Sequence, residues 1–346
     1  MTIHSYKTFD ECLGDRSTRY FGHGYKSVQQ SISNLTIDHE SSRVSGYAHV
    51  DYQVGWSQKR TETPLNPHLS SIDGVIIAVT LCEAFMIHAF GMHDEELQKA
   101  WVNKINVRAG TKPLTTLHQF AVEGQHVSSD NITETETVSL FACAIGTFKI
   151  TLQIQHKTLS STVQNKALEA YPQSMTSSQR IYGDLYKQTD YVSHRVHLDP
   201  AARTAAARLS LMEPDTAERS GLEASYRTSS LIIGAIIVAA QLSQVLLYKI
   251  DGLSREETDT LWMRKFDITV AQPQQDENKS AEVLLHARQA QVLDLRNLGV
   301  WRISDVAIEN FCGASVRGSL AYRLKPPPAA GQPLTDTVNN TTGGRP

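Results

Sequence analysis

The most constraining feature of this sequence is a long apolar stretch that occurs twice. Residues 67–90, PHLSSIDGVIIAVTLCEAFMIHAF, are apolar on every side from Gly74 onward, apart from Thr80, Glu83 and His88. A helix that is apolar all round is one surrounded by other parts of the protein. Membrane spans need about 20 residues and rarely carry a carboxylate, so we predict a buried core helix of a soluble protein.

The second occurrence is residues 227–248, RTSSLIIGAIIVAAQLSQVLLY, which has the same serine-rich start and the same early glycine. The flanking segments also repeat. RYFGHGYK from Arg19 matches RIYGDLYK from Arg180, and WVNKINV from Trp101 matches WMRKFDI from Trp262, each pair 161 positions apart. The offset is 160 between the early glycines of the two apolar stretches, Gly74 and Gly234. Landmarks that keep a nearly constant offset along the chain indicate an internal duplication. We therefore expect two copies of one fold.

Each copy is predicted to combine one helix with an antiparallel sheet, because alternating apolar and polar residues indicate half-buried strands. The order of strand, strand, helix and three more strands is that of the hotdog fold, in which a curved sheet wraps a helix. The predicted class is α+β, a tandem double hotdog. The expected strands are 27–38, 44–54, 102–107, 117–122 and 138–154 in the first copy, and 182–198, 205–211, 265–270, 282–291, 301–309 and 313–324 in the second.

Composition and local pattern set the expected domain boundaries. The first domain is 1–157, with residues 1–18 as a lead-in that caps the first copy, and the second is 179–325. Residues 158–178 are rich in Ser, Thr and Gln and form the expected linker. The tail, 326–346, has almost no large apolar side chain to offset the entropy of ordering, so we expect it to be disordered.

Charge and cysteine usage exclude several classes of function. The formal net charge is −3, so no basic field favours nucleic acid or an anionic membrane. The four cysteines are scattered without zinc-ligand spacing, which predicts no metal site and is typical of a reducing compartment. The first residues lack the basic and apolar parts of a signal peptide. We expect a cytoplasmic protein.

The start of the first helix is the candidate catalytic site. His68 and Asp73 stand where the second copy has Thr228 and Ile233, so the duplication predicts one asymmetric site. The imidazole and the carboxylate are suited to divide acid and base work. Ser70 and Asp73 also match a capping box, which requires no catalysis.

Other residues are candidates for substrate binding. The free N–H groups of the first helical turn, from Ser71 to Gly74, form an expected oxyanion site. Glu83 lies about 15 Å further along the helix, where it lines an acyl tunnel or has a structural partner. His23 lies in the repeated segment RYFGHGYK, at a position where the second copy has an aspartate. The rest of this segment is expected to be scaffold. The second copy is expected to supply Tyr226 and Arg227 across the interface.

Two short motifs resemble known families. The segment HLSSIDG at 68–74 resembles the H-P-x-L-L-D-G/A motif of polyketide dehydratases, whose aspartate is catalytic, although Leu69 replaces the proline. The histidine motif of the first dehydratase hotdog has no match here. The segments YFGHGY at 20–25 and PHLSSID at 67–73 are similar to the avirulence D (AvrD) family, over about residues 10–325.

The AvrD resemblance implies a role in making syringolide-like acylated sugar lactones. The implied substrates are a β-ketoacyl thioester, on acyl carrier protein or coenzyme A, and a small ketose such as xylulose. A-factor-type butyrolactone synthases perform a similar condensation on a tandem hotdog. We expect acyl transfer, followed by aldol closure, without metal or redox cofactor, in a monomer with an internal pseudo-dimer or in a homodimer. The alternatives are a hotdog dehydratase or thioesterase, and a non-catalytic acyl-binding module.

Overall fold

The computed structural model describes residues 3–59, 65–159, 169–171, 179–213, 218–226, 231–258, 260–271, 280–295 and 298–324. The expected tail, 326–346, and most of the expected linker, 158–178, lie outside these residues.

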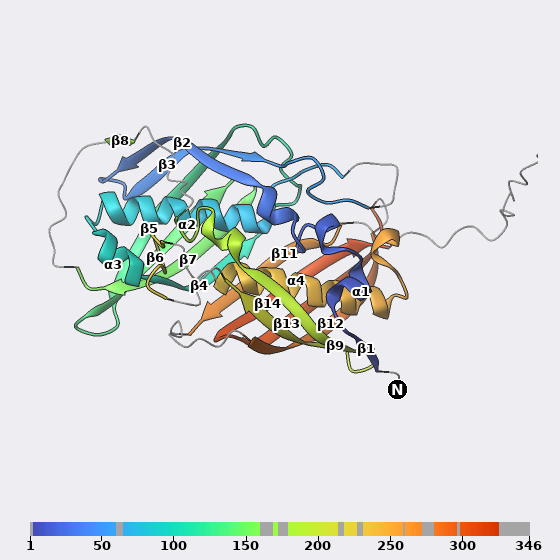
Figure 1. Cartoon of the computed structure of the whole chain (residues 1–346). Helices are drawn as coiled ribbons and strands as arrows, with labels where there is room; N and C mark the ends of the chain where they lie inside the picture. The colour runs from blue at the N-terminus through green and yellow to red at the C-terminus, as the bar shows by residue number, and fades with distance from the viewer. Residues whose placement is uncertain are drawn as a thin grey trace, which may run out of the picture.

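The described strands form a single 14-stranded sheet, in the order β1-β9-β10-β12-β13-β14-β11-β4-β7-β6-β5-β3-β2-β8 (Figure 1). All neighbouring strands in it are antiparallel, as predicted. The strands are β1 (His4–Tyr6), β2 (Gln29–Asp38), β3 (Arg43–Asp51), β4 (Trp101–Arg108), β5 (Phe120–Asn131), β6 (Glu136–Ile145), β7 (Phe148–Lys157), β8 (Glu169–Tyr171), β9 (Asp190–Asp199), β10 (Thr204–Met212), β11 (Trp262–Val270), β12 (Ser280–Leu295), β13 (Gly299–Phe311) and β14 (Ala314–Arg323).

Each half of the sheet holds one long buried helix. In the first half, α2 (Ser71–His88) packs on strands β2, β3, β5, β6 and β7. In the second half, α4 (Leu231–Ile250) packs on β9 to β14. Figure 1 shows both helices lying along their sheets. A helix wrapped by an antiparallel sheet is the predicted hotdog-type α+β arrangement. Shorter helices are α1 (Phe9–Leu13) and α3 (Asp94–Lys99), with 3₁₀ turns η1 (Arg16–Thr18), η2 (Gly24–Ser27), η3 (Leu185–Gln188) and η4 (Arg255–Glu257).

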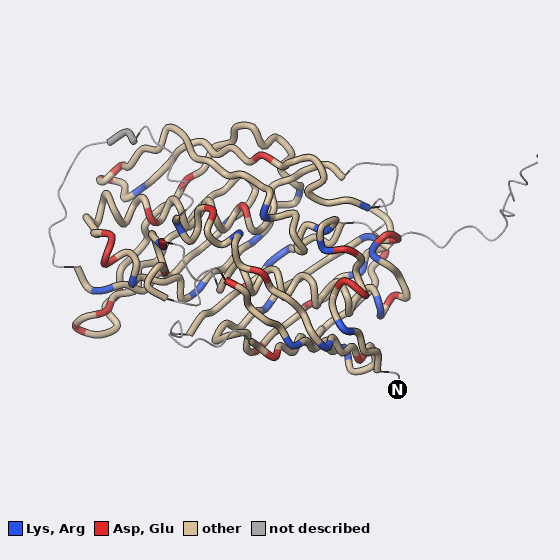
Figure 2. The backbone as a smooth tube through the Cα atoms, in the orientation of Figure 1, with Lys and Arg blue, Asp and Glu red and all other residues tan. Residues whose placement is uncertain are grey.

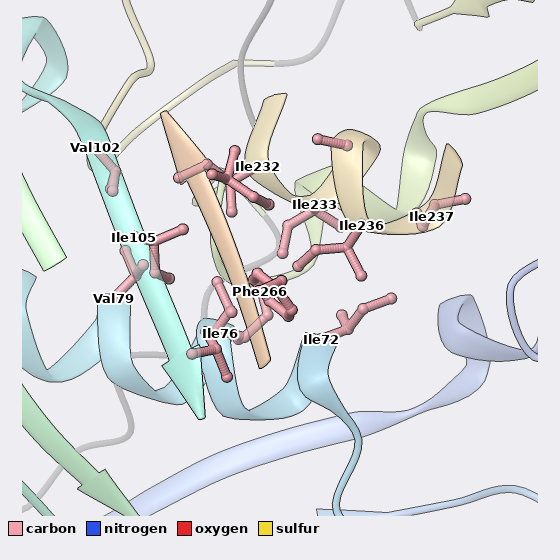
Figure 3. Packing of buried hydrophobic residues seen from close by; sticks show 14 of the residues in the cluster. Ile72, Ile76, Val79, Val102, Ile105, Ile232, Ile233, Ile236, Ile237 and Phe266 are labelled. Carbon is pink, nitrogen blue, oxygen red and sulfur yellow. The ribbon is translucent and has the colours of Figure 1, made fainter. Parts of the chain in front are cut away.

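The halves meet at a seam formed by β4 and β11, which pair antiparallel from Arg108 opposite Lys265 to Lys104 opposite Thr269. The helices approach each other beneath the seam, and the buried side chains of both halves belong to one hydrophobic cluster. Figure 3 shows isoleucines of α2 facing isoleucines of α4 beside Phe266 of β11. Both helices are apolar all round because each is covered by its own sheet and by the opposite half.

The halves also exchange their short leading strands. β1 pairs with β9 of the second half, and β8 pairs with β2 of the first. The expectation that residues 1–18 cap the first copy is therefore wrong, since α1 also packs on α4. Sequence pattern cannot reveal this, because a three-residue strand can add to either sheet edge.

The predicted strand 138–154 is in fact two strands, β6 and β7, joined by a tight turn at Gly146, whose φ is +56°. Apolar residues continue up to both sides of this turn, so no polar loop separates the strands in the sequence. The predicted strand 182–198 is also shorter, because residues 185–188 form η3 and β9 begins at Asp190.

The two long helices are apolar and long enough to cross a membrane, but 89% of the tested window of each is buried inside the protein. A core helix meets the same criterion of length and composition. Figure 2 shows Lys and Arg interspersed with Asp and Glu over both halves.

Candidate functional site

Helix α2 begins at Ser71 because Ser70 and Asp73 form a capping box. The Asp73 N–H donates to Ser70 Oγ over 3.2 Å, and the Ser70 N–H donates to Asp73 Oδ2 over 3.0 Å. These bonds satisfy backbone donors that a helix start leaves without intrahelical partners. The capping interpretation of Asp73 therefore holds, whatever else this carboxylate does.

Asp73 accepts more hydrogen bonds than a cap requires. Its side chain is fully buried. Oδ1 accepts from Gln30 Nε2 at 2.7 Å, while Oδ2 accepts from Ser70 Oγ at 2.7 Å and from the Tyr52 hydroxyl. These donors offset the cost of burying a carboxylate, which is high for an unpaired charge.

Three tyrosine hydroxyls surround this carboxylate. Tyr20 lies 2.5 Å from Ser70 Oγ, and Tyr52 also reaches the main-chain oxygen of His68 at 2.9 Å. Tyr186, from the second half, accepts from Gln30 Nε2 at 3.4 Å. Burial, followed by the charge of Asp73, raises the pKa of all three tyrosines. They are therefore protonated at neutral pH. Tyr52 donates directly to Asp73, Tyr20 contacts the Ser70 hydroxyl that donates to Asp73, and Tyr186 accepts from the Gln30 amide.

His68 forms the half-buried rim of the site. Its Nδ1 lies 3.3 Å from the Asn66 main-chain oxygen. A carbonyl oxygen only accepts, so Nδ1 carries the proton and Nε2 keeps its lone pair. Burial lowers the pKa of His68, which keeps the ring neutral at pH 7. The ring lies against Trp262 of the second half, with centroids 4.8 Å apart, and near Trp56 at 6.4 Å.

His68 and Asp73 are connected through Tyr52. Among the hydrogen bonds of the described residues, none joins the two side chains directly. Tyr52 instead contacts the Asp73 carboxylate and the His68 carbonyl group at once. The site therefore has the His68 imidazole on its rim and the buried Asp73 side chain on the other side of Tyr52.

Two of the N–H groups that were predicted to bind an oxyanion, those of Asp73 and Gly74, already donate to Ser70. The Gly74 N–H donates to the Ser70 main-chain oxygen at 3.0 Å, and the Asp73 N–H is used in the cap. The N–H groups of Ser71 and Ile72 are the first-turn donors that this leaves. Gly74 has a packing role, since a Cβ there would lie 3.2 Å from the Phe148 ring.

Glu83 has structural partners. It is 1% exposed, and its Oε2 lies 3.1 Å from Nη2 of Arg180, a residue of the second half. Its Oε1 accepts from the Leu222 N–H at 2.5 Å. His23 also faces the second half, with Nε2 3.5 Å from Asp190 Oδ1.

The second half supplies different residues from those expected. Tyr226 packs edge-on against Trp101, with centroids 5.9 Å apart, and its hydroxyl donates to the Lys99 main-chain oxygen at 2.7 Å. Trp101 and Trp262 lie beyond opposite ends of the β4–β11 pairing, so Tyr226 is far from His68. Arg227 lies outside the described residues.

Sequence reasoning missed Gln30, Tyr52 and Trp262, and it assigned Tyr20 and Tyr186 to scaffold segments. Tyr186 belongs to the repeated R-x-x-G-x-x-Y-K motif, whose retention in both copies was the available signal. Tyr52 follows a strand and belongs to no recognisable sequence motif. Its role follows from the fold alone.

A pocket of about 270 Å³ opens elsewhere on the seam and does not include His68 or Asp73. Its lining residues are Trp101, Asn103, Lys104, Glu136, Gln153, Gln155, Thr269, Val270 and Ala271. Within the described part of the chain, no group of three or more His, Cys, Asp or Glu residues is placed to hold a metal ion.

Several solved structures are distantly similar to this chain. An acyl-ACP thioesterase from Bacteroides thetaiotaomicron has a TM-score of 0.40 at 9% identity, covering 82% of this chain and 100% of that one. The acyl-CoA thioesterase II TesB2 from Mycobacterium marinum has 0.39 at 10%, covering 86% and 97%. The dehydratase domain of PpsC from Mycobacterium tuberculosis, in complex with C12:1-CoA, has 0.37 at 11%, covering 84% and 98%.

No curated protein matches the sequence. The family model for the Pseudomonas avirulence D protein (AvrD) matches residues 4–325. This match runs from β1 through both halves to the end of β14, as the two sequence segments predicted. The chain therefore belongs to the AvrD family.

Proposed function

We propose that this AvrD-family chain is a pair of hotdog units that condenses a β-ketoacyl thioester with a ketose such as xylulose. The product is an acylated sugar that closes to a syringolide-like lactone. The observation that carries the proposal is the asymmetry of the helix starts. A buried carboxylate, a neutral imidazole and three tyrosine hydroxyls gather at α2, where the equivalent of Asp73 in α4 is Ile233.

In this mechanism His68 is the base. Its Nε2 takes the proton from a sugar hydroxyl, and that oxygen attacks the thioester carbonyl carbon. When the tetrahedral intermediate collapses, the C–S bond breaks and the thiolate leaves with the proton that His68 returns. The products are an ester and a free thiol. An imidazole that is uncharged at pH 7 is suited to this step, because it can accept a proton without first losing one.

The oxyanion of the intermediate would be bound by the N–H groups of Ser71 and Ile72 at the positive end of the α2 dipole. Asp73 would act as a positioning residue. Its contact with Tyr52 holds the hydroxyl that supports the His68 carbonyl group, and its charge stabilises the imidazolium that forms transiently. Because Asp73 is fully buried, we place the substrate on the side of His68, between Trp56 and Trp262.

The test is an assay with purified full-length protein, a β-ketoacyl-coenzyme A and xylulose, followed by mass spectrometry of the products. Wild-type protein should give the acylated sugar and free coenzyme A. His68→Ala should reduce the rate by at least about 100-fold, in the range typical of a general base. Asp73→Asn should also reduce it, and this variant should fold, because the Gln30 amide can turn over to accept from the new amide group.

Tyr226→Phe is the matched control, since Tyr226 lies at the opposite end of the seam. It should retain the wild-type rate. Full activity of folded His68→Ala and Asp73→Asn proteins would contradict the proposed roles. Free acid in place of the acylated sugar would show a thioesterase, loss of water from a hydroxyacyl substrate would show a dehydratase, and binding without turnover would show an acyl-binding module.

A further inference from the structure

One end of the second half projects beyond the body of the sheet. Strand β10 covers β12 only as far as His286, with one further bond from the Ala287 N–H to the Arg203 main-chain oxygen at 2.9 Å. The other edge of β12 stays paired with β13 as far as Leu295 opposite Gly299. Among the described residues, no strand pairs with the outer edge of 288–295. We call residues 288–295 and 298–304 the β12–β13 ribbon.

The ribbon exposes apolar side chains on both faces. Successive strand residues point to opposite faces, yet all of 291–295 are exposed. An isolated two-stranded ribbon is marginally stable in water, and an apolar strand with an unpaired edge is a template for another strand. The exposed apolar residues are Val292 at 50%, Leu293 at 38%, Leu295 at 37%, Leu298 at 61% and Val300 at 37%.

The outer edge is complementary to itself in charge. The sequence of 288–295 is RQAQVLDL, whose only charged residues are Arg288 and Asp294. Arg288 is the extra residue of a β-bulge, since Ala287 pairs with Val306 and Gln289 pairs with Asp305. If two copies of this strand pair antiparallel about Gln291, the bulged Arg288 of each copy lies beside Asp294 of the other copy, and each Ala290 stands opposite Val292. A shift of two residues in either direction removes both charge pairs. Neighbouring charges of opposite sign stabilise paired strands, so this register is favoured over its neighbours.

We propose that the outer edge of β12 pairs with the same strand of a second copy of this chain, joining the two sheets around a twofold axis. Arg288 at present pairs with Glu309 over 2.6 Å, but both side chains are more than half exposed. An ion pair this exposed contributes little to stability, so exchanging it for Asp294 of the second copy costs little. An edge contact of this length is small for a protein interface, and the dimer is reversible and depends on concentration.

The test is sedimentation equilibrium of the full-length protein over a series of concentrations at low salt. The wild type should pass from monomer to dimer. Arg288→Asp and Asp294→Arg should each raise the dissociation constant by at least about tenfold, because each places like charges beside each other twice. The double variant Arg288→Asp/Asp294→Arg exchanges the two charges and should restore the wild-type dissociation constant to within about threefold.

Glu309→Gln is the matched control. It removes the intrachain partner of Arg288 without touching the edge, so it should leave the dimer intact. A wild-type chain that is monomeric at every concentration would overturn the proposal. So would a dimer that both single variants leave unchanged, or one that the charge exchange fails to restore, since either places the interface elsewhere.

Discussion

Tyr25 and Tyr186, which are equivalent residues of the sequence repeat, stack on each other with ring centroids 6.3 Å apart and planes inclined by 21°. They come from 3₁₀ turns η2 and η3, which contact each other. The repeated motif therefore does more than brace each copy. Its two tyrosines meet at the boundary between the halves.

The arginines of the same motif cross this boundary. Arg19 of the first half donates to Gln241 of α4 at 2.9 Å, and Arg180 of the second half pairs with Glu83 of α2. Each half thus anchors the central helix of the other. Because Tyr186 also reaches Gln30 beside Asp73, the boundary forms part of the candidate site.

The hydroxyl of Tyr52 should matter for stability as well as for activity. Tyr52→Phe removes a donor to a buried carboxylate, and a hydrogen bond to a charged group contributes about 1.5–3 kcal/mol. We expect the free energy of unfolding, measured by urea denaturation, to fall by about that amount, together with a loss of acyl transfer. Tyr47→Phe, on the exposed surface of β3, is the control and should change neither. An unaltered unfolding curve for Tyr52→Phe would contradict the described contact.

The ion pair of Arg180 with Glu83 predicts a strong single-variant effect. Arg180→Met leaves a buried carboxylate without its cation, which costs about 3–5 kcal/mol of unfolding free energy. Glu83→Gln in the same chain should recover much of this loss, because Gln still accepts from the Leu222 N–H without a charge. Arg43→Met breaks the exposed pair with Glu123 and should cost no more than about 1 kcal/mol. If Arg180→Met and the double variant Arg180→Met/Glu83→Gln lose the same unfolding free energy, this account of the ion pair is contradicted.

The pKa of the His68 imidazole should reflect both its burial and the nearby charge of Asp73. Burial lowers the pKa of this imidazole, and the charge of Asp73 acts in the opposite direction. Proton NMR of the His68 ring should therefore give a pKa below 6.5 in the wild type and a lower one in Asp73→Asn. The signal is assigned by its loss in His68→Gln. A pKa that rises in Asp73→Asn would be inconsistent with the proposed support of the imidazolium.

Acid should destabilise the protein through His156. This residue is buried, its Nδ1 donates to the Lys157 main-chain oxygen at 2.8 Å, and its Nε2 lies 2.8 Å from Ser139 Oγ. Burial lowers its pKa below 6.5 in the folded protein, so the unfolded chain binds more protons as pH falls below that value. The contribution of the neutral His156 to stability is fully present above pH 6.5. As the pH falls from 6.5 to the pKa of His156 in the folded protein, the free energy of unfolding decreases by up to about 1.4 kcal/mol per pH unit.

Urea denaturation at pH 7.5 and 5.5 measures this effect. His156→Gln should show a smaller loss between the two pH values than the wild type. His194→Gln, on the exposed surface of β9, should show the same loss as the wild type. If His156→Gln and the wild type lose stability equally, His156 is not a source of the acid sensitivity.

The sequence by itself determined the repeated elements. Uninterrupted apolar runs predicted α2 and α4, strict alternation predicted most strands, and Ser70 with Asp73 predicted the helix start, because each of these depends on residues close together in the chain. The fold was needed for contacts across the two halves. It placed Trp262 beside His68, Tyr186 beside Gln30 and Arg180 on Glu83, and it moved β1 onto the second half. Those neighbours are set by the pairing of β4 with β11 and by the exchange of leading strands, and no local pattern of side chains encodes which of two similar edges a strand will join.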